Sequence, residues 1–172
     1  MYEKLRPHYL KIGARKFVIG TVVLLIALDI LNSLYLREYW ELKNITINMI
    51  GKIIEGQGGN LSQLGPGTLR EIQEMVTNAF NFFLFVVLIN NLFFYVFYLR
   101  KKIWAQGYVL FYTISNGLLA ITFLIEGPIL GWPWYLFNIG AMFLYFYLYI
   151  GVKVLKNETT DEVTPERGTS VQ

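Results

Sequence analysis

Four long apolar runs constrain this sequence more than any other feature. Each contains about twenty residues with almost no charge, which is the helical length that crosses a hydrocarbon core about 30 Å thick. The runs are too evenly apolar for surface helices of a soluble domain, and they are too long and lack the polar alternation of barrel strands. We therefore predict an all-α, polytopic integral membrane protein, a four-transmembrane-helix bundle with spans at residues 17–36, 80–99, 107–126 and 131–152.

The composition agrees with this class and excludes several chemistries. Apolar residues make up 55% of the chain and charged residues 16%, whereas about a quarter is charged in a typical soluble domain. The absence of cysteine excludes disulfides, thiolate metal sites and cysteine nucleophiles, and the single histidine, His8, lies outside the apolar runs. We expect no cofactor and no bound metal. The net charge of +3 gives no reason to expect a nucleic acid partner.

Lysine and arginine in the flanks orient the four helices. They concentrate in the basic juxtamembrane segment 1–16, in the connection 100–106 and just after the fourth run, whereas the connection 127–130 has none. Short loops rich in these residues stay on the cytoplasmic side. The pattern predicts that both termini are cytoplasmic, and we expect the chain in the bacterial cytoplasmic (inner) membrane.

Residues 37–79 form the one sizeable segment predicted outside the membrane. Two amphipathic stretches flank a region rich in glycine, so we predict an outer helical hairpin that extends the first two spans, with Thr68 as the N-cap of its second helix. The alternative, in which residues 42–55 lie flat on the outer leaflet, stays open. The transmembrane domain with this hairpin covers residues 17–152, and the polar tail 153–172 is predicted to be disordered.

Polar side chains interrupt the apolar runs, and Asp29 is the one acid among them. A carboxylate that faces lipid near a helix centre costs about 2.5–3.5 kcal/mol on insertion scales, so Asp29 should face the other helices, with Asn138 or Asn32 as its hydrogen-bond partner. Counting along the helices places Asp29 and Asn138 in an outer layer, and Asn90, Asn91, Ser115 and Asn116 in an inner one. The expected intramembrane polar network comprises Asp29, Asn32, Asn90, Asn91, Ser115, Asn116 and Asn138.

Two interpretations of this network are weighed. In the first, the side chains hold the helices together by hydrogen bonds across the bundle. In the second, they form a proton-linked or polar-solute path with Asp29 as the titrating group. The first is favoured, because four helices are too few to enclose a pore and one acid is a sparse proton relay.

The sequence carries no catalytic motif. It has no Walker loop, no GxSxG and no HExxH, so we expect a non-enzymatic protein with no catalytic residues. Glu126, Trp132 and Trp134 mark a predicted outer interface. We expect an accessory, assembly or interaction subunit of a membrane complex, whose partners are lipid and either other membrane subunits or a second copy. An oligomeric proton-linked or small-solute transporter or channel, and a membrane sensor, are the alternatives.

Overall fold

The computed structural model describes residues 2–43, 45–56, 58 and 65–161. Within these ranges all regular secondary structure is helical, and the helices α2, α4, α5 and α6 are long and apolar enough to cross a membrane. The prediction of an all-α protein with four apolar spans is confirmed. The helices in chain order are α1 (Tyr2–Ile12), α2 (Ala14–Leu42), α3 (Ile45–Gly56), α4 (Pro66–Leu99), α5 (Ile103–Glu126) and α6 (Trp132–Asp161).

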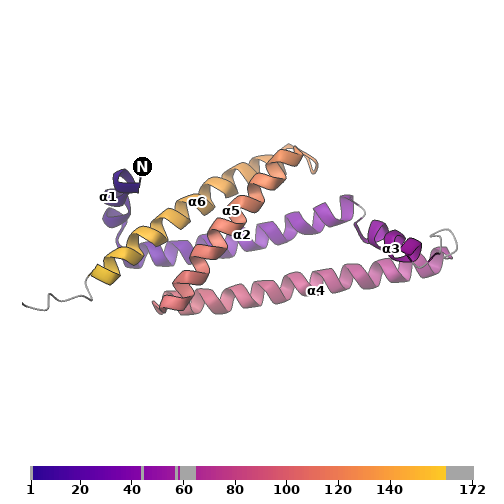
Figure 1. Cartoon of the computed structure of the whole chain (residues 1–172), viewed down its shortest axis with the longest axis horizontal. Coiled ribbons are helices and arrows are strands. Elements are labelled where there is room, and N and C mark those ends of the chain that lie inside the picture. The colour runs from indigo at the N-terminus through magenta and orange to yellow at the C-terminus, as the bar shows by residue number, and fades with distance from the viewer. Residues whose placement is uncertain (1, 44, 57, 59–64, 162–172) are drawn as a thin grey trace, which may run out of the picture.

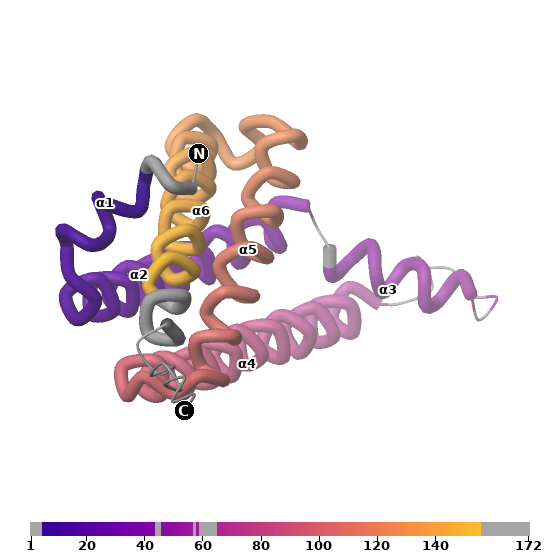
Figure 2. Tube along the Cα trace, turned by 60° about the vertical axis from the view of Figure 1, so that its left-hand side comes forward, coloured from indigo at the N-terminus to yellow at the C-terminus, as the bar shows by residue number. Residues whose placement is uncertain are grey.

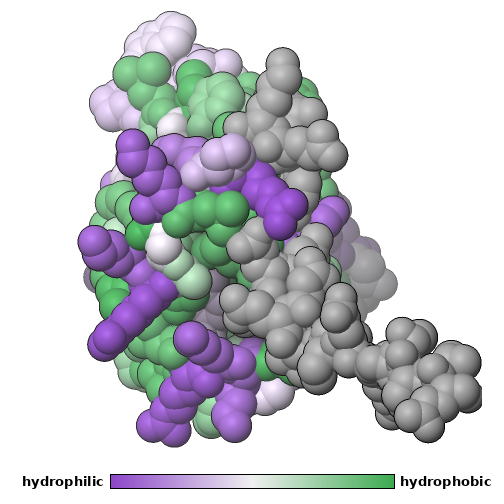
Figure 3. All heavy atoms as spheres, turned by 90° about the vertical axis from the view of Figure 1, so that its left-hand side faces the viewer, coloured by the Kyte–Doolittle hydropathy of each residue, from purple (hydrophilic) through white to green (hydrophobic). Residues whose placement is uncertain are grey.

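The four long helices form an elongated bundle with a short helix at each end (Figure 1). We call the end that holds the α5–α6 turn the turn end, and the end that holds the α4–α5 turn the basic end. At the basic end α1 packs against α6 and α2, and exposed lysine and arginine side chains surround an apolar body (Figure 3). At the turn end α3 packs against α2 and α4.

Helix α4 is the least embedded of the four. It contacts α2, α3 and α5 but not α6, and it diverges from α5 and α6 toward its N-terminus (Figure 2). In its most apolar window only 17% of the residues are buried, against 33% for α2 and α6. Much of its apolar surface is therefore not covered by the rest of the described chain.

The α5–α6 turn depends on glycine. Gly127 and Gly131 have φ angles of 83° and 96°, which a residue with a Cβ atom rarely adopts. The turn brings α5 and α6 together as an antiparallel hairpin, the most extensive helix–helix contact in the chain.

Several predicted boundaries differ from the structure. Helix α4 begins at Pro66, a residue suited to the first position of a helix, so Thr68 lies inside the helix and is not its N-cap. On the other side of the predicted hairpin, α2 ends at Leu42 and α3 is a separate helix. The predicted glycine-rich tip falls largely on residues 57 and 59–64, which lie outside the described residues.

The predicted disorder of the C-terminal tail is wrong for its first part. Helix α6 continues to Asp161, so residues 153–161 are helical. The apolar residues Val152 and Val154 are both 2% exposed, and their packing carries the helix past the end of the apolar run. Residues 162–172 lie outside the described part of the chain.

The best-packed region of the core lies toward the basic end, where α1 meets α6. Tyr9 is fully buried and donates a hydrogen bond to the backbone oxygen of Tyr147 at 2.9 Å. Gly151 allows this approach, because a Cβ atom there would lie 2.1 Å from the ring of Phe17. The N-terminal segment is thus packed against the bundle through specific contacts.

Candidate functional site

Asp29 is the centre of a polar cluster in the middle of the bundle. The residue is 5% exposed, and its Oδ2 accepts hydrogen bonds from Asn91 Nδ2 at 3.1 Å and from the Tyr95 hydroxyl at 2.8 Å. Its Oδ1 accepts a hydrogen bond from the Tyr112 hydroxyl at 2.5 Å. Three helices, α2, α4 and α5, therefore meet at one carboxylate, and the expectation that Asp29 faces the other helices is met.

Asn91 extends this cluster to a third tyrosine. Its Nδ2 also donates to the Tyr112 hydroxyl at 3.0 Å, and its Oδ1 accepts a hydrogen bond from the Tyr108 hydroxyl. The Tyr108 ring stacks on Phe94 with the ring centroids 3.7 Å apart, which fixes the position of its hydroxyl. We call Asp29, Asn91, Tyr95, Tyr108 and Tyr112 the Asp29 cluster.

The predicted partners of Asp29 were wrong. Asn138 donates to the backbone oxygen of Trp134 in its own helix at 3.0 Å, and Asn32 donates to the Tyr145 hydroxyl at 2.6 Å. Counting residues from the helix ends had also put Asp29 and Asn91 in different layers, whereas their side chains meet directly. The count assumes helices aligned at the membrane surface, but α4 extends past the end of its apolar run, and its offset relative to α2 comes from packing.

The remaining predicted network residues are dispersed. Asn116 donates to the backbone oxygen of Tyr112 at 2.9 Å, and Ser115 is half-buried on α5. Asn90 is exposed on α4. The predicted set thus divides into a central pair, Asp29 and Asn91, and asparagines that bond elsewhere.

Sequence reasoning missed the three tyrosines of the cluster. One signal could have found them: Asn91 with Tyr95, and Tyr108 with Tyr112, are polar residues four positions apart, which places each pair on one face of its helix. Buried tyrosine hydroxyls need a hydrogen-bond partner, so such pairs point toward an acceptor.

A small internal cavity of about 30 Å³ lies between α2, α5 and α6 toward the turn end. Its polar lining residues are Asn32, Tyr35, Asn116, Asn138 and Tyr145. A cavity of this size and polarity has room for a water molecule.

The predicted outer interface is engaged within the chain. Glu126 accepts a hydrogen bond from the Tyr39 hydroxyl at 2.7 Å, and Trp134 Nε1 donates to Glu38 at 2.6 Å. These bonds tie α2 to the ends of α5 and α6. Trp132 lies apart from them and is 66% exposed.

The Asp29 cluster has the character of a hydrogen-bonded junction. Each of its donors already has an acceptor, and within the described residues no three histidine, cysteine, aspartate or glutamate side chains are close enough to hold a metal ion together. Comparison with models of known protein families, with curated proteins and with solved structures finds no match.

Proposed function

We propose that this chain is a non-enzymatic multi-pass membrane protein that acts as an accessory or assembly subunit of a membrane complex, and that it docks through α4. The observation that carries the proposal is an uncovered face of α4 with a polar residue at its centre. The docking partner is a transmembrane helix of another subunit.

This face has the spacing of a helix–helix contact. Phe83, Val86, Asn90 and Phe93 follow one another at intervals of three and four residues, the pattern that keeps a seam directed at a partner helix. All four are exposed, with exposed fractions of 60% for Phe83, 46% for Val86 and 54% for Phe93. We call these residues the α4 seam.

Asn90 is the residue that distinguishes this face from an ordinary lipid-facing one. An amide in hydrocarbon is costly unless it is hydrogen-bonded, and asparagines in membrane helices commonly bond across a helix pair. The exposed position of Asn90 leaves its amide free to bond with a group on a partner helix. A partner helix would provide the missing polar group.

The proposal includes an orientation. The basic end, with the flanks rich in lysine and arginine, faces the cytoplasm of a bacterial cell, and the turn end faces outward. The transporter alternative has less support, because both oxygens of Asp29 are already engaged by donors from α4 and α5.

Single-cysteine cross-linking tests the docking face, since the chain has no cysteine of its own. Val86→Cys is expected to cross-link to another membrane protein in native membranes. Leu118→Cys, on α5 and 55% exposed, is the matched control and should stay uncross-linked. Equal cross-linking at both positions would refute docking through the α4 seam. A product of twice the chain mass would show that the partner is a second copy of this chain and not another protein.

A second variant tests the role of the amide. Asn90→Leu should weaken co-purification of the partner by about threefold, the factor that corresponds to one average interhelical hydrogen bond in a membrane. Phe85→Leu, which is 58% exposed on the side of α4 toward α2, should have little effect. Tighter association of Asn90→Leu would show that the amide contributes nothing to docking.

The orientation is tested by labelling intact cells with a maleimide that does not cross membranes. Pro128→Cys, in the α5–α6 turn, should react from outside, and Lys102→Cys should react only after the cells are opened. The reverse pattern would refute the proposed topology.

A further inference from the structure

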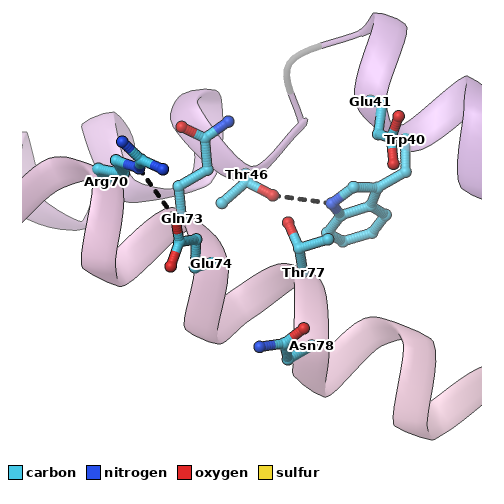
Figure 4. Close-up of a pocket in the computed structure, with 8 residues that line it drawn as sticks. All are labelled: Trp40, Glu41, Thr46, Arg70, Gln73, Glu74, Thr77 and Asn78. Atoms are coloured by element: carbon cyan, nitrogen blue, oxygen red, sulfur yellow. Dashed lines mark hydrogen bonds and ion pairs between the residues drawn. The ribbon is translucent and has the colours of Figure 1, made fainter.

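Two hollows follow one another along the seam between α2 and α4. The larger, of about 720 Å³, lies near the turn end and is lined mainly by polar side chains from three helices (Figure 4). The lining residues include Trp40 and Glu41 of α2 and Arg70, Glu74 and Asn78 of α4. We call it the polar hollow.

The second hollow, of about 220 Å³, lies nearer the middle of the bundle. Its lining is apolar except for Asp29, whose two oxygens are held by hydrogen bonds to α4 and α5. The apolar lining residues are Ile26 and Ile30 of α2 with Phe85, Leu88, Ile89 and Leu92 of α4. We call it the apolar hollow.

The helical repeat places both hollows on the same seam. On α4, residues 70, 74, 77 and 78 line the first hollow, and residues 85, 88, 89 and 92 line the second. Steps of three, four and seven residues connect these positions, so they share one face of the helix. This face is the flank of α4 toward α2, and the residues of the α4 seam proposed for docking line neither hollow.

The length of α4 places the two hollows at different depths. Its 34 residues extend about 51 Å, well beyond a hydrocarbon core of about 30 Å. Counting about twenty residues from Leu99, next to the basic turn, reaches Phe80, on which Trp40 stacks with ring centroids 4.1 Å apart. Tryptophan is common at this boundary. The polar hollow therefore lies at the depth of lipid headgroups, and the apolar hollow lies within the hydrocarbon.

From this arrangement we infer that the α2–α4 seam is a binding site for a phospholipid with a primary amine in its headgroup. The polar hollow holds the headgroup, and the apolar hollow holds part of one acyl chain. The inference does not depend on the proposed docking role, because none of the four residues of the α4 seam lines either hollow.

The charges of the polar hollow select the headgroup. Glu41 and Glu74 are carboxylates, and Arg70 is the one cation among the lining residues. Arg70 pairs with Glu74 at 2.9 Å and Arg37 pairs with Glu41 at 3.3 Å, but these are surface pairs whose side chains are all more than half exposed, so a zwitterionic headgroup can still reach both signs of charge. An ammonium group with three N–H donors complements the carboxylates, while the phosphate can reach Arg70. A purely anionic headgroup would meet two like charges. A trimethylated ammonium would lack the donors.

The apolar hollow contributes shape complementarity to the acyl chain and little binding free energy. Bulk lipid is as apolar as this lining, so an acyl chain gains little by transfer from the bilayer. Selectivity should therefore come from the headgroup. A large side chain in the apolar hollow should nevertheless exclude the lipid by steric overlap.

Native mass spectrometry of the full chain released from mild detergent tests the inference, with phosphatidylethanolamine, phosphatidylcholine and phosphatidylglycerol of identical chains as probes. We expect phosphatidylethanolamine to be retained about threefold to fivefold more than the other two, a factor typical of one partly exposed ion pair. Equal retention of all three lipids would overturn the inference.

Three variants localise the binding. Leu88→Trp fills the apolar hollow and should abolish the preference, whereas Leu118→Trp, on the exposed face of α5, should retain it. Glu74→Gln lies on a solvent-exposed turn of α4 and should fold normally while reducing the preference to near equality. A preference unchanged in Glu74→Gln would overturn the headgroup assignment. Cross-linking through Val86→Cys should persist in every variant, so failure of the docking proposal is distinguishable from failure of this one.

Discussion

Replacement of Asp29 tests whether the carboxylate stabilises or destabilises the folded bundle. Asp29→Leu removes the acceptor of three hydrogen bonds, those from Asn91, Tyr95 and Tyr112. It also removes a carboxylate from a low-dielectric interior. These two effects have opposite signs, so the sign of the net change in stability depends on their sizes.

The structure allows both effects to be estimated. Three buried donors without an acceptor cost about 2 kcal/mol each, or about 6 kcal/mol in all. Removal of the carboxylate returns the remaining cost of burying an ion in the bundle, about 3 kcal/mol. Asp29→Leu should therefore destabilise the fold by about 3 kcal/mol. Asp29→Asn keeps one oxygen acceptor and loses the carboxylate, so its net effect should stay within about 1 kcal/mol.

Unfolding in bicelles, followed by trapping of the unfolded chain, would measure these free energies. Ser33→Ala is a control on the same helix, because Ser33 donates only to the backbone oxygen of Asp29 within α2, and its effect should be small. Adding Tyr95→Phe to Asp29→Leu should recover part of the loss, since one orphaned hydroxyl disappears. A gain of stability in Asp29→Leu, or equal losses in the leucine and asparagine variants, would refute this reasoning.

Two further predictions concern the ends of the bundle. Gly151→Ala should destabilise the folded state by about 1–3 kcal/mol through overpacking against Phe17, which a Cβ atom at Gly151 would approach to 2.1 Å. In the same unfolding assay Gly20→Ala, with no atom within 4 Å of its Cβ position, should be neutral or stabilising, and an equal loss in both variants would contradict the packing argument. Tyr39→Phe removes an exposed hydrogen bond to Glu126 and should change the free energy of unfolding by less than about 1 kcal/mol. A larger loss would mean that the turn end is a main source of stability.

The helices themselves could be predicted from the sequence, because an apolar run of about twenty residues has few other stable structures. The inward direction of Asp29 was also predictable, since the alternative exposes a carboxylate to lipid. The extent of α6 was not. Composition marks residues 153–161 as polar, but Val152 and Val154 pack against the bundle and extend the helix.

The partners of Asp29 could not be deduced from one sequence. Which side chains meet across helices depends on the rotation and the axial offset of each helix, and several offsets bury a similar amount of apolar surface. A shift of α4 by one turn, about 5.4 Å, would take Asn91 or Tyr95 out of reach of the carboxylate. Recognition of the Tyr108–Tyr112 pair would have narrowed the candidates on α5 but would not have fixed the offset.

The contact between α1 and α6 has a consequence for the order in which the molecule assembles. Helices α5 and α6 are neighbours in the chain and can pair as soon as both are in the membrane, whereas Tyr9 and Tyr147 are separated by 138 positions. Helix α1 is synthesised first, but it can pack against α6 only after that last span has been made. A chain that stops short of α6 would therefore leave α1 without its contact to that helix. The packing of α1 at the basic end can be completed only after synthesis has reached the final span.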